Sequence, residues 1–298
     1  MAEQLPALPG MLLRAVPTMV SRKKALNEEP KDLQFTFQLG AFDRAHIEKY
    51  RAMFPGFVSE IPLTYFYLAA QRAHLAAMLD PSFPWPILGM VHVANKMTQF
   101  QAVAPASGFR LEVIIEMPER AATKKRVRPI YRVEFWQHNE LIVECISTYQ
   151  VGGGEPPKRG RHRSMPAPDL SGFEDTGLWQ LSSERGRQYA NLSGDYNPIH
   201  LHPWLSRWFG FSRPIIHGMY SVGRAQAKIE SLAKKPVTMM DVIFRRPLIL
   251  PAEAHFYYAG SGSFCVTDAK AAKAFLDGHF NLGEVTDASL SSEGNEHE

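Results

Sequence analysis

The residues best suited to chemistry lie in one segment, Leu192–Met219, which reads LSGDYNPIHLHPWLSRWFGFSRPIIHGM. In it an acid, Asp195, and an imidazole, His200, stand five residues apart on either side of Asn197-Pro198. The residue before a proline avoids helical backbone, and Asp and Asn side chains bond the local backbone in turns. We therefore expect a sharp bend between Asp195 and His200 that lets both side chains face one point.

The end of the same segment predicts a place for negative charge. His217-Gly218-Met219 opens a stretch with helical periodicity, Gly218–Leu232. The first N–H groups of a helix have no intrahelical partner and lie at the positive end of its dipole, and Gly218 adds no side chain over them. A carboxylate, an imidazole and such donors together suit proton transfer with addition or loss of water beside a carbonyl.

Each of these residues also has a plain structural interpretation. Asp195 could be a capping residue and His200 a hydrogen-bonded polar side chain of a tight turn. For His217 we favour a structural hydrogen bond at the helix entrance over direct chemistry. His200, His202 and His217 could also be read as a metal cluster, but we expect no metal. A His-x-His pair on an irregular turn lacks the usual ligand geometry, and no cysteine is near.

The two blocks SGDYNPIH and GFSRPIIHGM resemble the signature of the MaoC-like, (R)-specific enoyl-CoA hydratase family, Ser-Gly-Asp-x-Asn-Pro-Ile/Leu-His followed by Gly-Phe and Pro-Ile-x-His-Gly-Met. The downstream VIFRRPLILP is similar to a strand of that family. The resemblance implies a hotdog fold, in which a sheet wraps a long central helix. It also implies reversible hydration of trans-2-enoyl thioesters to (3R)-3-hydroxyacyl thioesters, carried on CoA or acyl carrier protein, in fatty acid metabolism.

The resemblance also assigns roles to residues. It implies that Asp195 and His200 hold the reacting water, that Gly218 supplies the oxyanion N–H and that Asn197 shapes the turn. It leaves the division of protons between Asp195 and His200 open. No cofactor is implied beyond the CoA or phosphopantetheine that carries the substrate. One departure exists, because Gln226-Ala227 stands where single-repeat members often have Ser-Gly.

The chain reads as two weak copies of one pattern, a long helix followed by a strand meander. In the first half the helical stretch is Pro62–Leu79, followed by a strand-like run that ends at Pro105 and by three alternating runs, Phe109–Glu116, Ile130–Gln137 and Glu140–Val151. In the second half the helix is Gly218–Leu232, followed by a run that ends at Pro251 and by Ala254–Ala259, Ser263–Ala269 and Ala274–Leu282. With the resemblance, this order predicts an α+β double hotdog, each repeat having an antiparallel sheet around a long central helix.

We expect five regions along the chain: an N-terminal extension (1–30), a degenerate hotdog repeat (31–151), a linker rich in Gly, Pro and basic residues (152–170), a catalytic MaoC-like repeat (171–283) and an acidic disordered tail (284–298). Within the extension, Met11–Lys24 could be a docking arm, but we favour a segment that lies on the surface. In the first repeat, Leu63-Thr64-Tyr65 stands where the second has His217-Gly218-Met219, so the first lacks the motif. The resemblance implies that such an inactive repeat shapes the acyl tunnel.

Composition narrows the class of protein further. The chain has 298 residues and a net charge of only +3, which gives no reason to expect nucleic acid binding. No run is apolar for long enough to span a membrane. Two separated cysteines, Cys145 and Cys265, exclude a zinc ribbon and a Cys-x-x-Cys redox pair, do not suggest a disulfide scaffold and favour the cytoplasm.

The sequence offers several candidates for contact with the CoA or carrier protein that bears the substrate, and it allows more than one assembly state. Arg245 and Arg246, and the basic run Lys158–Arg163, are candidates for contact with phosphate or with an acidic carrier protein. The aromatic residues Trp204, Trp208, Phe209 and Phe211 are expected to pack in the core and lid rather than to line an acyl entrance. Two fused repeats allow a monomer or a homodimer. The alternatives to a hydratase are a hotdog acyl-CoA thioesterase and a non-catalytic acyl-thioester-binding scaffold.

Overall fold

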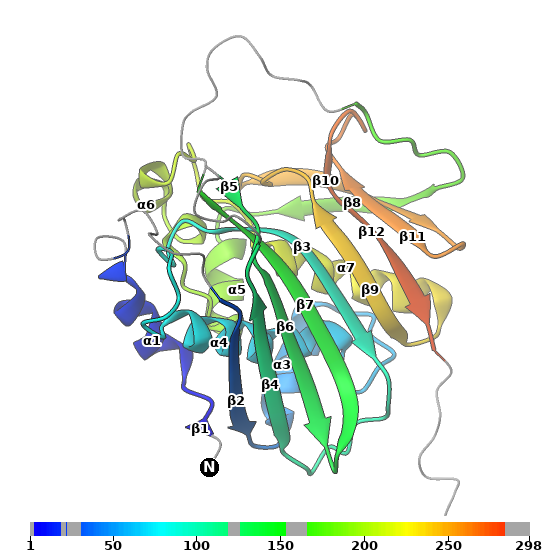
Figure 1. Ribbon diagram of the computed structural model, residues 1–298. Helices are drawn as coiled ribbons and strands as arrows, with labels where there is room; N and C mark the ends of the chain where they lie inside the picture. The colour runs from blue at the N-terminus through cyan, green and yellow to red at the C-terminus, as the bar shows by residue number, and fades with distance from the viewer. Residues whose placement is uncertain (1–2, 19–21, 23–30, 119–125, 153–165, 284–298) are drawn as a thin grey trace, which may run out of the picture.

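In the computed structural model, one sheet curves around two long helices (Figure 1). The structure describes residues 3–18, 22, 31–118, 126–152 and 166–283. The predicted linker falls largely outside the described residues, and the predicted acidic tail lies wholly outside them. No helix in the described ranges is long and apolar enough to cross a membrane.

The strands run in the order β1-β2-β4-β6-β7-β3-β9-β12-β11-β10-β8, with β5 beside β7. The first half supplies β1 (Glu3–Gln4), β2 (Leu33–Leu39), β3 (Val91–Gln99), β4 (Phe109–Glu116), β5 (Arg126–Val127), β6 (Ile130–Gln137) and β7 (Glu140–Gly152). The second half supplies β8 (Glu174–Leu181), β9 (Val237–Phe244), β10 (Ala252–Ala259), β11 (Ser263–Thr267) and β12 (Ala274–Leu282). Apart from the parallel pair β1–β2, neighbouring strands are antiparallel.

The sheet is two copies of one five-stranded unit joined edge to edge. Read from the outside inward, β2-β4-β6-β7-β3 has the same internal order as β8-β10-β11-β12-β9. The copies meet where β3 pairs with β9, from Ala94–Ile243 to Thr98–Met239. The predicted double hotdog of the α+β class is therefore confirmed, and the backbone groups of both inner edges are paired with each other.

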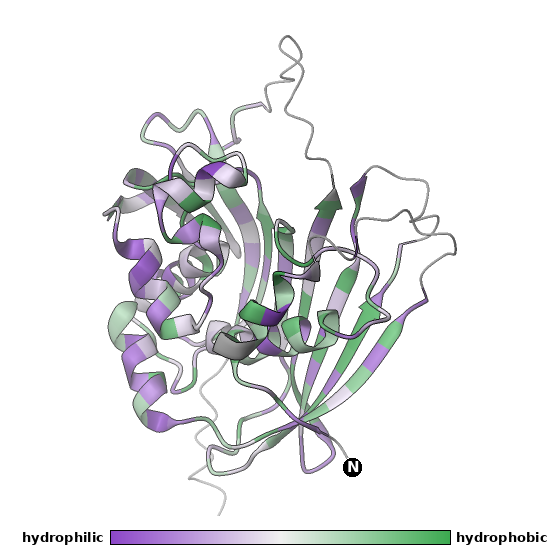
Figure 2. Ribbon diagram, turned by 90° about the vertical axis from the view of Figure 1, so that its left-hand side faces the viewer, coloured by the Kyte–Doolittle hydropathy of each residue, from purple (hydrophilic) through white to green (hydrophobic). Residues whose placement is uncertain are grey.

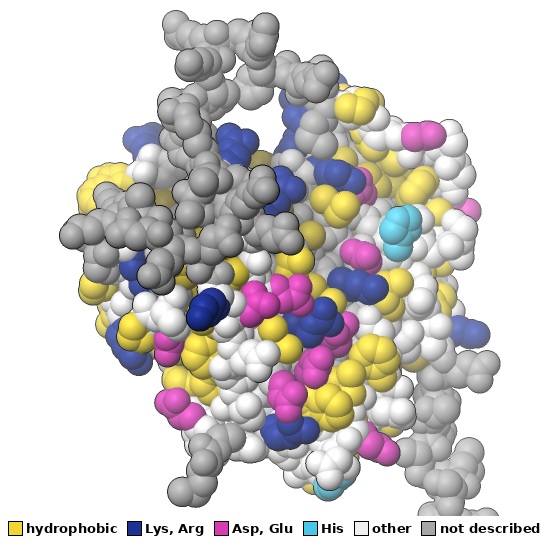
Figure 3. All heavy atoms as spheres, in the orientation of Figure 1, with side chains coloured by type: hydrophobic (Ala, Val, Ile, Leu, Met, Phe, Trp, Pro, Cys, Tyr) yellow, Lys and Arg dark blue, Asp and Glu magenta, His cyan; other side chains and the backbone are white. Residues whose placement is uncertain are grey.

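Alternating strands bury one face of the sheet against the helices. Residues of β4 and β6 alternate between buried and part-exposed along their whole length, and the colours alternate along the strands in Figure 2. The outer face carries charged side chains of both signs (Figure 3), including Arg132 between Glu116 and Glu144. This is the pattern of a sheet with one solvated face.

The helices fill the concave side. In the first half a single turn, η1 (Leu63–Tyr65), leads into α4 (Phe66–Met78), and the second half has α7 (Gly218–Ala233). Shorter helices precede them, α3 (Arg44–Met53) and α5 (Arg185–Ser193). Sequence periodicity predicted α4 and α7 but not α3, α5, β2 or β8.

Buried hydrogen bonds from α7 fix the two halves against each other. The carboxylate of Glu230, which is fully buried, accepts from the backbone N–H groups of Val58 at 2.6 Å and Ser59 at 2.8 Å. Gln226 donates to the same carboxylate at 2.7 Å, and its carbonyl oxygen accepts from Thr64 N–H at 2.9 Å. Because Thr64 lies just before α4, these bonds place α4 relative to α7.

The expectation that Met11–Lys24 lies on the surface is wrong for the described part of this segment, in which Met11, Ala15 and Thr18 are buried. Strand β1 joins the sheet edge, and α1 (Leu8–Ala15) buries Leu8, Met11 and Ala15 in the core. Arg72 on α4 donates to the Leu5 carbonyl at 2.9 Å. Apolar residues at helical spacing thus anchor this segment against α4.

The aromatic prediction also needs correction. On the short helix α6 (Pro203–Trp208), Trp204 is 58% and Trp208 73% exposed, so neither belongs to the core. Phe209 packs beside Gly89, and Phe211 lines the large internal cavity. Trp204 and Trp208 are four residues apart on one face of α6, where their rings contact each other with centroids 5.0 Å apart, and this face is turned to solvent.

Candidate active site

The predicted bend is present and begins at the end of α5. The helix ends at Gly194, whose φ of +76° is left-handed and whose missing Cβ would lie 2.9 Å from Leu8. The Asp195 side chain then accepts the Asn197 N–H at 3.1 Å, and the Asn197 side chain accepts the Ile199 N–H at 3.4 Å. These two turns lead into a single turn of 3-10 helix, η3 (Pro198–His200). Asp, Asn and Pro residues favour such tight turns of the backbone.

The ring of His200 is held by a backbone carbonyl. Its Nδ1 lies 2.8 Å from the Ile215 oxygen, and since a carbonyl only accepts, Nδ1 carries the proton. The lone pair is therefore on Nε2. Burial lowers the pKa of His200, opposed by the charge of Asp195, so the imidazole is neutral at neutral pH.

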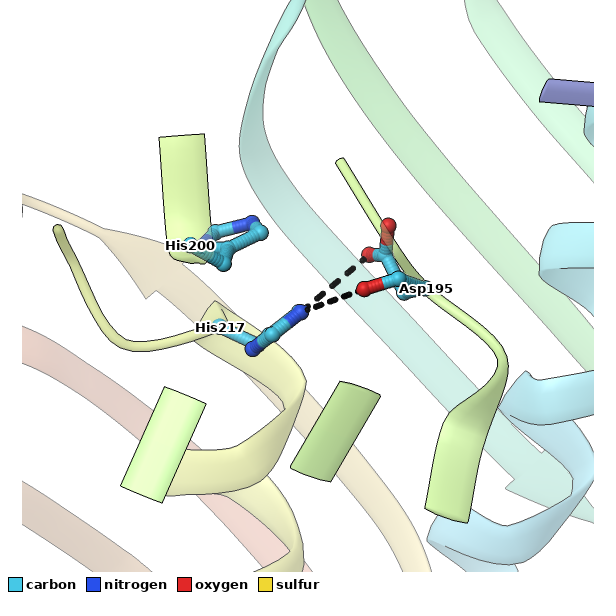
Figure 4. Close-up of side chains that lie close together, drawn as sticks. All are labelled: Asp195, His200 and His217. Carbon is cyan, nitrogen blue, oxygen red and sulfur yellow. Dashed lines mark hydrogen bonds and ion pairs between the residues drawn. The ribbon is translucent and has the colours of Figure 1, made fainter. Parts of the chain in front are cut away.

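His217 ties the bend to the start of α7. Its Nε2 lies 3.0 Å from the Asp195 backbone oxygen and donates to it, and lies 3.9 Å from a carboxylate oxygen of Asp195 (Figure 4). Burial, with the neighbouring His200, lowers the pKa of His217 to about 3. These contacts agree with a positioning role at the helix entrance.

Asp195 faces both imidazoles. Its burial favours the neutral acid, but His217, His200, the polar side chain of Gln71 and the Asn197 N–H together hold the pKa of its carboxyl below the usual range. Polar atoms of Asp195, His200 and His217 all lie within 4.8 Å of one another. The bend thus brings an ionised acid and a neutral imidazole to one point.

The possible ligand atoms of Asp195, His200 and His217 lie close enough together to hold a metal ion. The sequence analysis considered His200, His202 and His217 for such a cluster, and His202 does not belong to this group. The imidazoles of His200 and His217, however, stack with centroids 3.6 Å apart and planes 26° apart. Ring-nitrogen lone pairs lie in the ring planes, so lone pairs of nearly parallel, stacked rings do not converge on one ion. Their other nitrogens are engaged by backbone carbonyls.

Gly218 begins α7 directly beside this point. As the first helical residue its N–H has no intrahelical partner, and the His217 side chain does not cap the helix. A Cβ at Gly218 would come within 2.7 Å of the Phe244 ring. Glycine is therefore required by close approach, and the N–H is available as a donor.

Comparison with known proteins agrees with this geometry. Residues 175–272 match the family model described as MaoC like domain. These residues form a MaoC-like domain. The chain is 26% identical over 223 residues to 3-hydroxyacyl-thioester dehydratase X of Mycobacterium tuberculosis, covering 73% of this chain and 76% of the relative.

A second relative and a solved structure extend the likeness. Over 65 residues, 21% of each chain, the identity to peroxisomal enoyl-CoA hydratase 2 of Arabidopsis thaliana is 42%. The crystal structure of HtdX of Mycobacterium tuberculosis aligns with a TM-score of 0.67 and 23% identity, over 84% of this chain and 100% of that chain. The likeness to HtdX covers both repeats, whereas the family model covers the second.

The MaoC-like domain opens on a cavity of about 750 Å³ that extends into the first repeat. Asp195, His200 and Gly218 line it from the domain. On the side of the first repeat its wall includes polar residues, among them Tyr67, Gln71, His92 and Tyr149, and an apolar group, Leu75, Met78, Ile87, Leu88 and Met90. Sequence reasoning named none of these polar residues as functional, since their place depends on how the repeats pack.

Arginines from both repeats line the same cavity. Arg245 and Arg246 of the MaoC-like domain are among them, and so is Arg128 of the first repeat, which sequence reasoning missed. Arg245 Nε lies 3.0 Å from both carboxylate oxygens of Asp277, while Arg128 bonds the Gln150 side chain. Of the predicted basic candidates, Arg245 and Arg246 therefore reach the cavity, although Arg245 is partly engaged. The other candidate, the run Lys158–Arg163, lies outside the described residues.

Proposed function

We propose that the chain is an acyl-thioester hydratase/dehydratase that interconverts trans-2-enoyl and (3R)-3-hydroxyacyl thioesters. One observation carries the proposal: an ionised Asp195, a neutral His200 and the free N–H of Gly218 border one cavity at the end of a MaoC-like domain. Relatives named as 3-hydroxyacyl-thioester dehydratase and enoyl-CoA hydratase support it.

In the proposed hydration a water molecule is held between Asp195 and His200. One of the two accepts a proton as the water oxygen bonds to C3, the C2=C3 electron pair moves toward the thioester carbonyl, and the Gly218 N–H donates to the enolate oxygen. A proton then returns to C2, so that one water has added across the double bond. Dehydration is the reverse, and either group can act as the proton donor.

Positioning in this mechanism falls to Asn197 and His217. The Asn197 side chain closes the turn that carries His200, and His217 holds the Asp195 carbonyl. No cofactor takes part in the proposed reaction. We expect that treatment with a chelator leaves turnover unchanged, whereas a loss restored by added Zn²⁺ would assign Asp195, His200 and His217 to a metal.

The carrier group is proposed to bind at the arginines. CoA and phosphopantetheine both bear phosphate, which guanidinium groups bind well. We expect Arg246→Ala to raise KM for enoyl-CoA several-fold with kcat preserved. We further propose that a monomer suffices, because β3–β9 already pairs the repeats, and that the protein works in a reducing cytoplasm, since Cys145 and Cys265 are free and buried.

The test is to mix the protein with short and long trans-2-enoyl-CoA and to follow the enoyl absorbance together with free thiol. Loss of enoyl without thiol supports the proposal. Thiol release would instead indicate a thioesterase, and no change at any chain length a binding scaffold. Asp195→Asn and His200→Ala should each lower kcat about 10²- to 10⁴-fold with the circular dichroism spectrum unchanged.

A further inference from the structure

Four polar side chains of the first repeat form a cluster in the wall of the cavity, which we call the polar cluster. Tyr67 and His74 come from α4, His92 from β3 and Tyr149 from β7, and all four line the cavity. His74 is fully buried, and the ring of His92 stacks on that of Tyr149 with centroids 4.6 Å apart. The part of the wall that the first repeat supplies is therefore polar in one section and apolar in another.

Hydrogen bonds join the polar cluster into one chain with a histidine at each end. The Tyr67 hydroxyl lies 2.9 Å from the Tyr149 hydroxyl and 3.4 Å from His92 Nδ1. The Tyr149 hydroxyl in turn lies 3.5 Å from His74 Nδ1. The Nε2 atoms of His74 and His92 are buried, and neither has a hydrogen-bond partner among the described residues. Buried polar atoms are rarely left unpaired in native proteins, so these two nitrogens indicate a partner that binds in the cavity.

The positions of the protons along this chain determine the chemistry of that partner. Each hydroxyl carries one proton, and each neutral imidazole carries one on either Nδ1 or Nε2. For all three contacts to be hydrogen bonds, the donors must point the same way along the chain. If Tyr67 donates to His92, the free Nε2 of His92 carries a proton and that of His74 carries a lone pair; the opposite direction exchanges the two. One end therefore donates and the other accepts, which matches a hydroxyl group, since a hydroxyl does both.

The polar cluster lies close to the catalytic residues. The ring of His92 packs against that of Phe244 with centroids 4.9 Å apart. The Phe244 ring also comes within 2.7 Å of the point that a Cβ of Gly218 would occupy. One aromatic ring therefore separates the polar cluster from the proposed oxyanion donor. The apolar section of the wall continues on the same face of α4, at Leu75 and Met78.

We propose that the polar cluster binds a hydroxyl group on the acyl chain, so that the enzyme selects enoyl thioesters whose chain carries an oxygen beyond C3. This inference names the substrate class of the proposed function and rests on it. Burial lowers the pKa of His74 and His92 to about 3, so both are uncharged at neutral pH. A carboxylate would lose its hydration without gaining a cation from the polar cluster, whereas a hydroxyl would be paired. An uncharged oxygen is therefore the better match.

Matched substrates test the proposal. Each pair is a straight-chain trans-2-enoyl-CoA with and without a hydroxyl group at the far end of its chain, over a series of chain lengths. At the length that reaches the polar cluster we expect kcat/KM to be about 10- to 100-fold higher for the hydroxylated member, because the other member leaves buried polar groups unpaired. Equal kcat/KM within every pair, or a preference for a chain that ends in a carboxylate, would overturn the proposal.

Two substitutions locate the selectivity in the polar cluster. His74→Phe removes one end of the chain, and Tyr149→Phe keeps the ring but removes the hydroxyl that joins His74 to Tyr67. We expect each variant to bring the two kcat/KM values of a pair within about 3-fold of each other. If either variant folds, by its circular dichroism spectrum, and keeps the wild-type preference, the proposal is wrong. A fall in kcat by the same factor for both members, with the preference intact, would assign the cluster to the reaction instead of to the hydroxyl and would also overturn it.

Tyr131→Phe provides the control. Its ring packs against those of His74 and Tyr149, with centroids 5.3 and 5.0 Å away, but it is not among the residues that line the cavity. This variant makes the same change as Tyr149→Phe behind the polar cluster, so the preference for the hydroxylated substrate should remain. A loss of preference as large as that in Tyr149→Phe would mean that packing, and not the hydrogen-bonded chain, determines the selectivity.

Binding of saturated esters separates this proposal from the proposed function. A saturated acyl-CoA has no double bond to hydrate, so titration calorimetry with and without the terminal hydroxyl measures recognition alone. If the wild-type protein hydrates no enoyl thioester, the proposed function is overturned. If it hydrates them but the two saturated esters have Kd values within about 3-fold at every length, the function stands and the hydroxyl site is overturned. Tighter binding of the hydroxylated ester that is lost in His74→Phe supports the site.

Discussion

The bond from His200 Nδ1 to the Ile215 carbonyl determines what that imidazole can do. This bond leaves Nε2 as the ring nitrogen that faces the cavity. Burial lowers the pKa of His200, so the ring stays neutral to a lower pH than a free imidazole does. A neutral His200 beside an ionised Asp195 gives the site one acid–base pair with a single net charge. Such a site can accept a proton from water without first losing one.

This protonation state predicts the pH profile of the reaction. Because burial lowers the pKa of His200, its neutral form persists to lower pH than in a free imidazole. We expect kcat/KM for an enoyl-CoA to be flat from about pH 7 to 8, with the acid side below about 6.5. A profile that falls already near about pH 7.5 would contradict a lowered pKa of His200.

The close approach of Phe244 to Gly218 predicts the effect of a substitution at this position. A methyl group there would press on Phe244, whose ring atoms lie 2.7 to 3.1 Å from the point that a Cβ would occupy. We expect Gly218→Ala to lower kcat by on the order of 10- to 100-fold, since the donor shifts from the oxyanion position. Adding Phe244→Leu should recover part of the loss, and a double variant no better than the single one would argue against the clash.

At the scale of elements, α7 serves both the chemistry and the joining of the repeats. Its first residue is Gly218, and its last two turns carry Gln226 and Glu230, which bond the loop before α4. Gln226 stands where a resembling single-repeat pattern has a small hydroxyl residue. In this chain Gln226 instead accepts a hydrogen bond from the Thr64 N–H of the first repeat.

The contribution of Glu230 to joining the repeats can be measured as a change in the free energy of unfolding. A buried carboxylate that accepts several N–H and O–H groups is stable only while those donors converge on it. We expect Glu230→Gln to lower the free energy of unfolding by about 2–4 kcal/mol, because its amide turns a donor toward other donors. Denaturant unfolding measures this, with Glu253→Gln on the exposed side of β10 as the control; equal midpoints for both variants would contradict it.

The sequence predicted those elements that the pattern of neighbouring residues determines. Three strands were predicted with the bounds they have, Phe109–Glu116, Ile130–Gln137 and Ala274–Leu282, and the first two alternate strictly between buried and part-exposed residues. The bend at Asp195 followed from its Asx and proline chemistry. The burial of α1 and the bond between Gln226 and the Thr64 N–H did not, because both depend on how distant segments pack.

At the scale of the whole molecule, the edge pairing of β3 with β9 explains why both repeats persist. It sets the two concave faces side by side, so that the cavity begins at Asp195 and continues between α4 and the strands of the first repeat. The first repeat therefore supplies part of the cavity wall and, through the bond between Gln226 and the Thr64 N–H, part of the frame that holds α7. A chain cut to the MaoC-like domain would lose both.

The buried histidines make the whole fold sensitive to acid. Burial lowers the pKa of His74, His92 and His217 to about 3 each. Unfolded histidine titrates near 6.5, so between about pH 6.5 and 3 the unfolded chain binds protons that the native one does not. The free energy of unfolding must then fall as pH falls, by up to about 1.4 kcal/mol per pH unit for each histidine.

Urea unfolding at a series of pH values measures this slope. We expect the midpoint to be nearly constant from about pH 8 to 7 and to drop steeply between about pH 6 and 4.5. His74→Phe removes one titrating group from the interior, where its ring packs against Tyr131 and Tyr149. Whatever its effect at about pH 8, the variant should lose stability less steeply below about pH 6.5. A slope equal to that of the wild-type protein would mean that His74 is already protonated in the native state.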